Sequence, residues 1–313
     1  MTTTCSSDKK IRFGLFAATA LGLALSVRAA EVAEQHDMPY LDAGRQETLD
    51  LYLPAPSPDG ARRAGVVWIH GGGWAAGTKR DRREVAVSRG LAEAGFVVVS
   101  VDYRLATKEQ PGWPVAVQDC KNAVRFLRAH ADKYGIDPAR IAVAGGSAGA
   151  HLALMVAYTA NDPALEPSSP YPGVSNEVGA VIELYGITNL LTRQKADKQG
   201  NPTGQLVDSS APRFTGKTRA EGSDLWRYAS PVSHVRRDVP PTFISHGKRD
   251  ATVDYPQALE LADALKAAGV TYELVMLEKA GHTFDLTHWG KHPLEKDLTP
   301  LVVGFLQKHL GGK

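Results

Sequence analysis

The chain contains little cysteine: Cys5 and Cys120 are the only two among 313 residues. Two cysteines this far apart do not form the disulfide framework on which small secreted domains depend. With 43% hydrophobic residues, the chain is long enough to bury a substantial core instead. Because Cys120 lies on an apolar helical face, we interpret it as a core residue and not as a reactive thiol.

A strong charge of either sign is also missing. The formal net charge is only +2, and no basic patch of the kind that binds nucleic acid stands out. Long apolar runs are missing too, since the longest candidate, residues 13–27, is shorter than the roughly 20 residues that a membrane-spanning helix needs. We therefore expect neither a nucleic-acid partner nor stable insertion into a membrane.

The uncharged stretch 13–27 has the flanks of a secretory signal. Lys9, Lys10 and Arg12 precede it, and small residues follow it around Ala29. We predict a signal peptide over residues 1–29 and hence a secreted or periplasmic protein. Cleavage would remove Cys5, together with four basic residues and one acidic residue, so the net charge would fall from +2 to −1. A single N-terminal membrane anchor is the alternative.

The rest of the chain alternates strand-like and helix-like patterns. We expect a short hairpin at 39–41 and 48–53, and then buried strands at 65–70, 95–103, 140–145, 179–186, 241–247 and 272–277. Helices are expected at 82–94, 117–131, 257–268 and 298–305. This alternation predicts a single α/β domain over 30–313, with a mostly parallel sheet and helices on both faces. Such folds bind ligands at the carboxyl ends of their strands.

Residues 188–231 interrupt the alternation. They are polar, punctuated by glycine and proline, and longer than an ordinary connection. We expect a lid-like insertion above the sheet edge that contributes to a substrate pocket. A mobile surface loop without a role is the alternative.

A serine crowded by glycines follows one of the predicted strands. Residues 141–152, IAVAGGSAGAHL, combine an apolar run, the pattern Gly145-x-Ser147-x-Gly149 and the start of a helix. A hydroxyl raised on a sharp strand-to-helix turn needs neighbours without Cβ atoms. The pattern is that of a nucleophile elbow, although an ordinary strand-to-helix turn would also fit these three positions.

An elbow requires an oxyanion hole upstream. The strand 65–70 leads directly into His70-Gly71-Gly72-Gly73-Trp74. Three successive glycines allow backbone N–H groups to approach a reacting carbonyl. We predict that the N–H groups of Gly72, Gly73 and Ala148 are the donors, and that His70 holds the loop by hydrogen bonds.

An acid and a histidine are required downstream. Asp250 follows the strand 241–247, and His282 follows the strand 272–277. Ser147, Asp250 and His282 occur in the chain order that this fold demands, and we predict that they form a catalytic triad. Asp254 is the competing acid, but it lies just before the helix 257–268, where a carboxylate complements the helix dipole.

The other histidines are less suited to catalysis. His151 lies four residues after Ser147, and we expect it to pack under the elbow. His288 and His292 are spaced for a shared metal, but Gly290 and Pro293 disfavour a regular helix and no further ligand motif accompanies them. We therefore expect neither a metal nor another cofactor.

With these motifs in place, the chain resembles the α/β-hydrolase family of secreted esterases. It is most similar to the hormone-sensitive-lipase-like group and to the bifunctional feruloyl and acetyl xylan esterases. The resemblance covers about residues 45–310 and rests on HGGGW (70–74), VDYRLA (101–106), the segment 113–153, HGKRDATV (246–253) and GHTF (281–284).

The resemblance also places roles on residues. It carries nucleophile, acid and base onto Ser147, Asp250 and His282, and it implies that Trp74 and Trp113 line or support the acyl pocket. One departure is Asn189, where similar proteins often have aspartate.

We expect a serine carboxylesterase that acts on short acyl groups, with a small-molecule or carbohydrate ester as its substrate. Two alternatives stay open: an amide hydrolase with the same triad, such as an exopeptidase or formamidase, and a noncatalytic binding protein on a hydrolase scaffold. Peptidases of this fold usually carry a large partner domain, which is not evident in the sequence. A binding protein would be expected to have lost a triad member.

Overall fold

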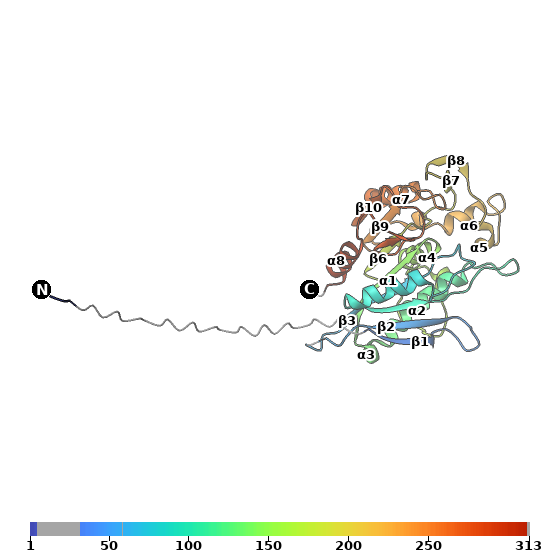
Figure 1. Ribbon diagram of the computed structural model, residues 1–313. Coiled ribbons are helices and arrows are strands. Elements are labelled where there is room, and N and C mark those ends of the chain that lie inside the picture. Colours follow the sequence, from blue (N-terminus) through green and yellow to red (C-terminus); the bar gives the residue numbers. More distant parts are fainter. Residues whose placement is uncertain (5–31, 58, 312–313) are drawn as a thin grey trace.

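A computed structural model describes residues 1–4, 32–57 and 59–311. The predicted signal peptide, 1–29, therefore lies outside the described residues except for its first four positions. The centre of the molecule is an eight-stranded sheet with the order β1-β2-β4-β3-β5-β6-β9-β10 (Figure 1). Its strands are β1 Ala33–Pro39, β2 Thr48–Leu53, β3 Arg63–Ile69, β4 Val97–Val101, β5 Ile136–Gly146, β6 Ala180–Leu184, β9 Thr242–Gly247 and β10 Tyr272–Leu277.

Six of these strands, β4-β3-β5-β6-β9-β10, are parallel to one another, whereas β2 is antiparallel to both β4 and β1. The central strands are buried on both faces because successive side chains point to opposite sides. On β3, Val67 and Ile69 belong to one apolar cluster, and Val66 and Trp68 belong to the other. The predicted mostly parallel α/β sheet is therefore confirmed.

Helices cover both faces. The first cluster packs against α2 Val115–Ala129, α4 Ala148–Tyr158 and α7 Pro256–Ala268, and the second packs against α1 Arg82–Glu93 and α8 Thr299–Leu310. Cys120 is fully buried in α2, as predicted for a core residue. The helix predicted to run to 131 ends at Ala129 and is followed by α3 Ala131–Tyr134. Gly135 then terminates α3 in the left-handed conformation.

The first strand lies earlier than predicted. We expected a strand at 39–41, but β1 spans Ala33–Pro39 and pairs with β2 from Ala33↔Leu53 to Pro39↔Thr48. The error has a physical reason: β1 is an edge strand with exposed polar side chains, so it lacks the apolar alternation that marks a half-buried strand.

The insertion 188–231 has secondary structure of its own. It contains a hairpin, β7 Gln194–Ala196 with β8 Pro202–Leu206, and two short helices, α5 Ala211–Thr215 and α6 Ser223–Tyr228. In Figure 1 these elements gather at one end of the molecule. Two 3-10 turns, Pro163–Leu165 and Pro231–His234, and the short pair β11 His288–Trp289 with β12 His292–Pro293 complete the described elements. No helix in the described ranges combines the length and apolarity needed to cross a membrane.

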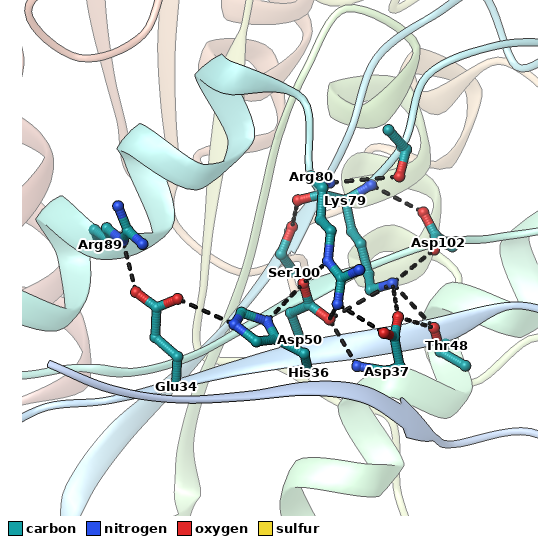
Figure 2. Close-up of polar contacts among 11 residues, drawn as sticks. Glu34, His36, Asp37, Thr48, Asp50, Lys79, Arg80, Arg89, Ser100 and Asp102 are labelled. Atoms are coloured by element: carbon teal, nitrogen blue, oxygen red, sulfur yellow. Dashed lines mark hydrogen bonds and ion pairs between the residues drawn. The ribbon is translucent and has the colours of Figure 1, made fainter.

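An ion-pair network ties the segment before α1 to the antiparallel edge of the sheet (Figure 2). The Lys79 ammonium donates to Asp37 at 2.9 Å and to Asp102 at 3.1 Å. Arg80 Nε donates to Asp50 at 2.8 Å. Asp50 is fully buried and also accepts the N–H of Asp37 at 2.9 Å. Since this segment continues the glycine loop after β3, the network anchors one end of that loop.

We predict that Asp50→Asn lowers the free energy of unfolding by about 3 kcal/mol, because it leaves the buried Lys79 cation and Arg80 short of a carboxylate. Urea titration followed by circular dichroism measures the loss. The control is Asp132→Asn, which removes an exposed ion pair to Arg62 and should cost less than about 1 kcal/mol. Equal losses in the two variants would contradict the anchoring role of the network.

Candidate active site

The polar residues predicted for the site come together at one edge of the sheet. β3, β5, β9 and β10 are all parallel, so their carboxyl ends point the same way. The glycine loop follows β3, Ser147 follows β5, Asp250 follows β9 and His282 follows β10. Segments separated by more than two hundred residues thereby reach one cavity.

Ser147 has a strained backbone. Its φ of 57° and ψ of −123° lie outside the usual regions for a residue with a side chain. It directly follows β5 and directly precedes α4, and its N–H donates to the carbonyl of Leu184 at 2.9 Å. The turn leaves the side chain 9% exposed at the head of a helix that is itself buried along its length.

The glycines around Ser147 are required by close backbone approach. A Cβ on Gly149 would lie 2.1 Å from the carbonyl oxygen of Ile69, and one on Gly145 would lie 2.5 Å from the carbonyl carbon of Gly149. No Cβ fits at these two positions, because the neighbouring atoms belong to the backbone. Gly146, to which the elbow pattern assigns no requirement, is also closely packed: its Cβ would lie 2.4 Å from the hydroxyl of the fully buried Tyr185.

Ser147, His282 and Asp250 form a hydrogen-bonded chain. The Ser147 hydroxyl lies 3.0 Å from His282 Nε2, and His282 Nδ1 lies 2.6 Å from Asp250 Oδ2. This geometry fits a neutral imidazole that donates Nδ1–H to the carboxylate and accepts the hydroxyl proton at Nε2. The structure therefore brings the three predicted side chains into direct contact.

Asp250 is fully buried and held from several sides. Its Oδ1 accepts the N–H groups of Thr252 at 2.8 Å and Val253 at 2.9 Å. His246 Nε2 lies 3.2 Å from Oδ2 and 3.0 Å from the carbonyl of Val253. Burial raises the pKa of Asp250, but the hydrogen bonds from His246 and His282 outweigh it, so the pKa lies well below its ordinary value. Asp250 is thus an anion under ordinary conditions.

Asp254, the competing acid, has another role. Its Oδ1 accepts the N–H of Gln194 at 2.9 Å, and it shows no hydrogen bond to His282. It lies two residues before the first residue of α7 and is fully buried. Asp254 therefore fastens the insertion to the segment that carries Asp250.

The glycine loop lies directly against Ser147. A Cβ on Gly71 would lie 3.3 Å from the Cβ of Ser147. Gly72 and Gly73 have φ values of 107° and 59°, which glycine adopts readily. Within the described ranges, the N–H groups of Gly72, Gly73 and Ala148 have no hydrogen-bond acceptor. His70 Nδ1 lies 2.7 Å from the carbonyl of Gly71, which confirms that His70 holds the loop.

His151 joins three parts of the site below the elbow. Its Nδ1 accepts the Trp74 indole N–H at 3.1 Å, and its Nε2–H donates to the carbonyl of Ala229 at 2.8 Å. It is fully buried, and burial lowers its pKa to about 4. The prediction that His151 packs under the elbow is confirmed. It ties the glycine loop to the insertion through α4.

A cavity of about 490 Å³ opens beside Ser147 and His282. Other residues that line it are Gly71, Gly72, Gly73, Trp74, Gly77, Asp81, Arg83, Ile187, Arg193, Ser209, Ser210, Thr252, Val253 and Thr283. The insertion contributes Arg193, Ser209 and Ser210. A volume of this size suits a small ligand or one group of a larger ligand.

The two tryptophans suggested for the acyl pocket are placed differently. Trp74 lines the cavity but is fully buried, and it stacks on Phe214 with ring centroids 4.6 Å apart. Trp113 does not line the cavity; it contacts Phe214 and Tyr228 edge-on at 5.9 and 5.6 Å. Trp113 therefore packs against Phe214, which in turn supports Trp74 at the cavity. Asn189 is also outside the cavity lining, and its amide donates to Glu260 at 2.6 Å.

Two residues at the site were missed by sequence reasoning. His246 belongs to the HGKRD motif, but its contact with Asp250 was not predicted. Arg193 lies in the polar insertion, where no periodicity distinguishes one cation from another. One feature of the sequence could have indicated the role of His246: it lies at the end of a predicted strand, four residues before Asp250.

His288 and His292 do not share a helix face. They lie on the paired strands β11 and β12, and both are exposed. In the part of the chain that the structure describes, no group of three or more histidine, cysteine, aspartate or glutamate side chains is placed to hold a metal ion.

Together, the mostly parallel sheet, the glycine-flanked serine at the end of its central strand and the acid and histidine on later loops define the α/β-hydrolase class. The chain belongs to the BD-FAE family, whose model matches residues 49–265. Esterase LipQ of Mycobacterium tuberculosis is 32% identical over 256 residues, covering 81% of this chain and 58% of LipQ. The chain spans between 53% and 58% of the length of LipQ and two further curated mycobacterial relatives.

Solved structures show the same fold. Esterase 2 of Thermogutta terrifontis, phosphoramylated by tabun, superposes with a TM-score of 0.70 at 28% identity, covering 91% of this chain and 97% of the other. A truncated carbohydrate esterase from gut microbiota superposes with a TM-score of 0.77 at 23% identity, covering 91% and 98%. At that identity, the second similarity supports the fold alone.

A buried carboxyl lies behind the site. Glu183, on β6, is fully buried, and its Oε1 accepts the N–H of Gly186 while Oε2 has no partner among the described residues. Burial raises its pKa from an ordinary 4.5 to about 7, against the opposing effects of His246 and the Gly186 N–H. Between pH 4.5 and about pH 7, Glu183 is therefore protonated in the folded protein but ionised in the unfolded chain.

We predict that Glu183 makes the protein less stable as the pH rises from about 4.5 to about 7. The loss levels off at about 3 kcal/mol above that range. Glu183→Gln should remove this part of the pH dependence, as measured by urea unfolding at pH 5 and pH 8. The exposed Glu93→Gln serves as the control and should retain the wild-type profile. A Glu183→Gln profile parallel to that of the wild type would contradict the raised pKa.

Proposed function

We propose that the protein is a serine carboxylic ester hydrolase that works through an acyl-enzyme. The observation that carries this proposal is the chain of contacts from Ser147 through His282 to Asp250, at 3.0 and 2.6 Å. Acyl transfer also requires a site for the developing oxyanion. Ser147 lies beside three backbone N–H groups that lack acceptors within the described ranges and can supply this site.

In the acylation step, Ser147 Oγ attacks the ester carbonyl carbon while His282 Nε2 takes the hydroxyl proton. Asp250 stays ionised and stabilises the imidazolium through Nδ1–H. The carbonyl oxygen becomes an oxyanion and accepts hydrogen bonds from Gly72, Gly73 and Ala148. When the tetrahedral intermediate collapses, the bond to the alcohol oxygen breaks and His282 returns its proton to that oxygen.

Water then hydrolyses the acyl-enzyme by the same route. His282 removes a proton from the water as it attacks the acyl carbon, and it returns that proton to Ser147 Oγ when the acid leaves. No side-chain group beyond the triad is needed for either half of the cycle.

The substrate class that we propose is short acyl esters, including acetyl or feruloyl groups on plant polysaccharide. The cavity volume of about 490 Å³ and its serine, threonine and arginine lining support a small polar ligand over a long fatty chain. The resemblance of the sequence motifs to feruloyl and acetyl xylan esterases points the same way.

We predict that Ser147→Ala lowers kcat for para-nitrophenyl acetate by about 10⁶-fold, as in a triad whose nucleophile is removed. Rates on para-nitrophenyl esters, acetylated xylan, methyl ferulate and aminoacyl anilides, with circular dichroism to verify folding, measure the loss. A fluorophosphonate should add its mass to the wild type and not to Ser147→Ala.

Asp250→Asn and Asp254→Asn form a matched pair for the same assay. Asp250→Asn should lose about 10⁴-fold in kcat because the imidazole loses its orienting acceptor, whereas Asp254→Asn should lose far less. Ester turnover that survives Ser147→Ala would refute the proposal. Cleavage of anilides without cleavage of esters would instead favour an amide hydrolase.

We also propose that the protein is exported, on the basis of the basic flank and apolar stretch within residues 9–28. Expression of the full chain in a Gram-negative host should yield mature protein in the periplasm that begins at Ala30, as determined by N-terminal sequencing. Full-length protein that remains in the membrane fraction would instead favour the N-terminal anchor.

A further inference from the structure

Arg193 is a buried cation that lines the candidate active-site cavity. It stands just before β7 of the insertion and is only 8% exposed. Its guanidinium donates to the Ser210 hydroxyl at 3.0 Å and to the Thr252 carbonyl at 2.9 Å, and its Nε has no partner in the described part of the chain. Both acceptors are neutral, so they do not compensate the charge.

This lack of an ion pair distinguishes Arg193 from the other buried cations. Four lysine or arginine side chains are buried among the described residues: Lys79, Lys121, Arg125 and Arg193. Lys79 pairs with Asp102 at 3.1 Å, Lys121 pairs with Glu166 at 3.1 Å and Arg125 pairs with the same Glu166. Arg193 takes part in none of the ion pairs of the described residues, and its hydrogen-bond acceptors are the neutral Ser210 and Thr252. Buried charges in proteins are normally paired, which makes this exception informative.

The nearby carboxylates do not form an ion pair with Arg193. Asp250 binds His282 and His246. Asp254 Oδ1 accepts the N–H of Gln194, and Asp254 Oδ2 has no hydrogen-bond partner among the described residues. Burial lowers the pKa of Arg193, while Asp254 and Asp250 oppose this effect from a longer distance. Neither Asp250 nor Asp254 is therefore close enough to form an ion pair with Arg193.

The rest of the cavity wall places no carboxylate in contact with Arg193. The second arginine that lines it, Arg83, is paired with the buried Glu84 at 2.6 Å. Asp81 is the one carboxylate among the described lining residues, and it is exposed and accepts the N–H of Thr78 at 3.3 Å. An anionic group that enters beside Ser147 would thus meet one uncompensated guanidinium.

We propose that the cavity binds esters that carry a carboxylate on the acyl or the alcohol part, with Arg193 as the residue that binds this carboxylate. This inference rests on the proposed ester hydrolase function and narrows its substrate class. An arginine forms strong, directional hydrogen bonds to a carboxylate, and shielding from water strengthens them. The bound substrate supplies the counter-ion that the free protein lacks.

The test compares esters that differ in one charge. On the alcohol side, para-acetoxybenzoate is compared with para-acetoxybenzamide. On the acyl side, mono-para-nitrophenyl adipate is compared with para-nitrophenyl hexanoate. The wild type should favour the anionic member of one pair by about 10-fold or more in kcat/KM, and added NaCl should reduce that preference.

Variants separate binding from a structural role. Arg193→Met should lower the anionic-to-neutral ratio by about 10- to 100-fold, and Arg193→Lys should retain part of the preference. Lys195→Met is the matched control: it removes one exposed cation from β7, two residues after Arg193, and should leave the ratio as in the wild type. If Arg193→Met slows both members of each pair equally, Arg193 has a structural role and the proposal fails. It also fails if the wild type shows no preference in either pair.

A binding measurement distinguishes this inference from the proposed function. Benzoate and adipate should raise the melting temperature of Ser147→Ala protein, and Arg193→Met in that background should abolish the effect. If the wild type hydrolyses none of the four esters but carboxylates still bind through Arg193, the hydrolase proposal is refuted and the carboxylate site stands. Ester hydrolysis without carboxylate binding would refute the carboxylate site and support the hydrolase proposal.

Discussion

The close contact between β3 and the first turn of α4 is the constraint on which the rest of the site depends. The carbonyl of Ile69 occupies the space that a Cβ on Gly149 would need, at 2.1 Å. Because β3 continues directly into the glycine loop, the contact that lets Ser147 adopt its φ of 57° also sets the loop against the serine. The nucleophile and the oxyanion donors are therefore positioned by one contact between β3 and the first turn of α4.

Polar contacts, more than apolar packing, hold the loops above this contact. His151 joins Trp74 of the glycine loop to Ala229 of the insertion, and Lys79 and Arg80 anchor the far end of the loop at the antiparallel edge. On the other side, Asp254 binds the insertion to the segment that carries Asp250. Loops bear exposed or strained backbone that an apolar core cannot satisfy, so directional hydrogen bonds must fix them.

Several features could be predicted from the sequence because they depend on neighbours in the chain. The elbow pattern around Ser147, the three glycines after β3 and the positions of Asp250 and His282 after strands all follow from local pattern and strand order. β1 was misplaced because none of its side chains is buried on either face, so nothing imposes an apolar alternation. His246 was missed because its contact with Asp250, four residues further on, depends on how the chain turns after β9. Arg193 was missed because its lack of a carboxylate partner depends on which residues the fold brings around it.

Local sequence was enough to specify the alternation of strands and helices and the chain order of serine, acid and histidine. These follow from apolar periodicity and backbone sterics, which act over a few residues. Folding was needed to establish that His151 is locked between Trp74 and Ala229, that Asp254 holds the insertion, and that Arg193 faces the cavity without an ion pair among the described residues. The burial of a side chain and its ion pairs depend on all the residues that the fold brings around it, so a local sequence pattern does not determine them.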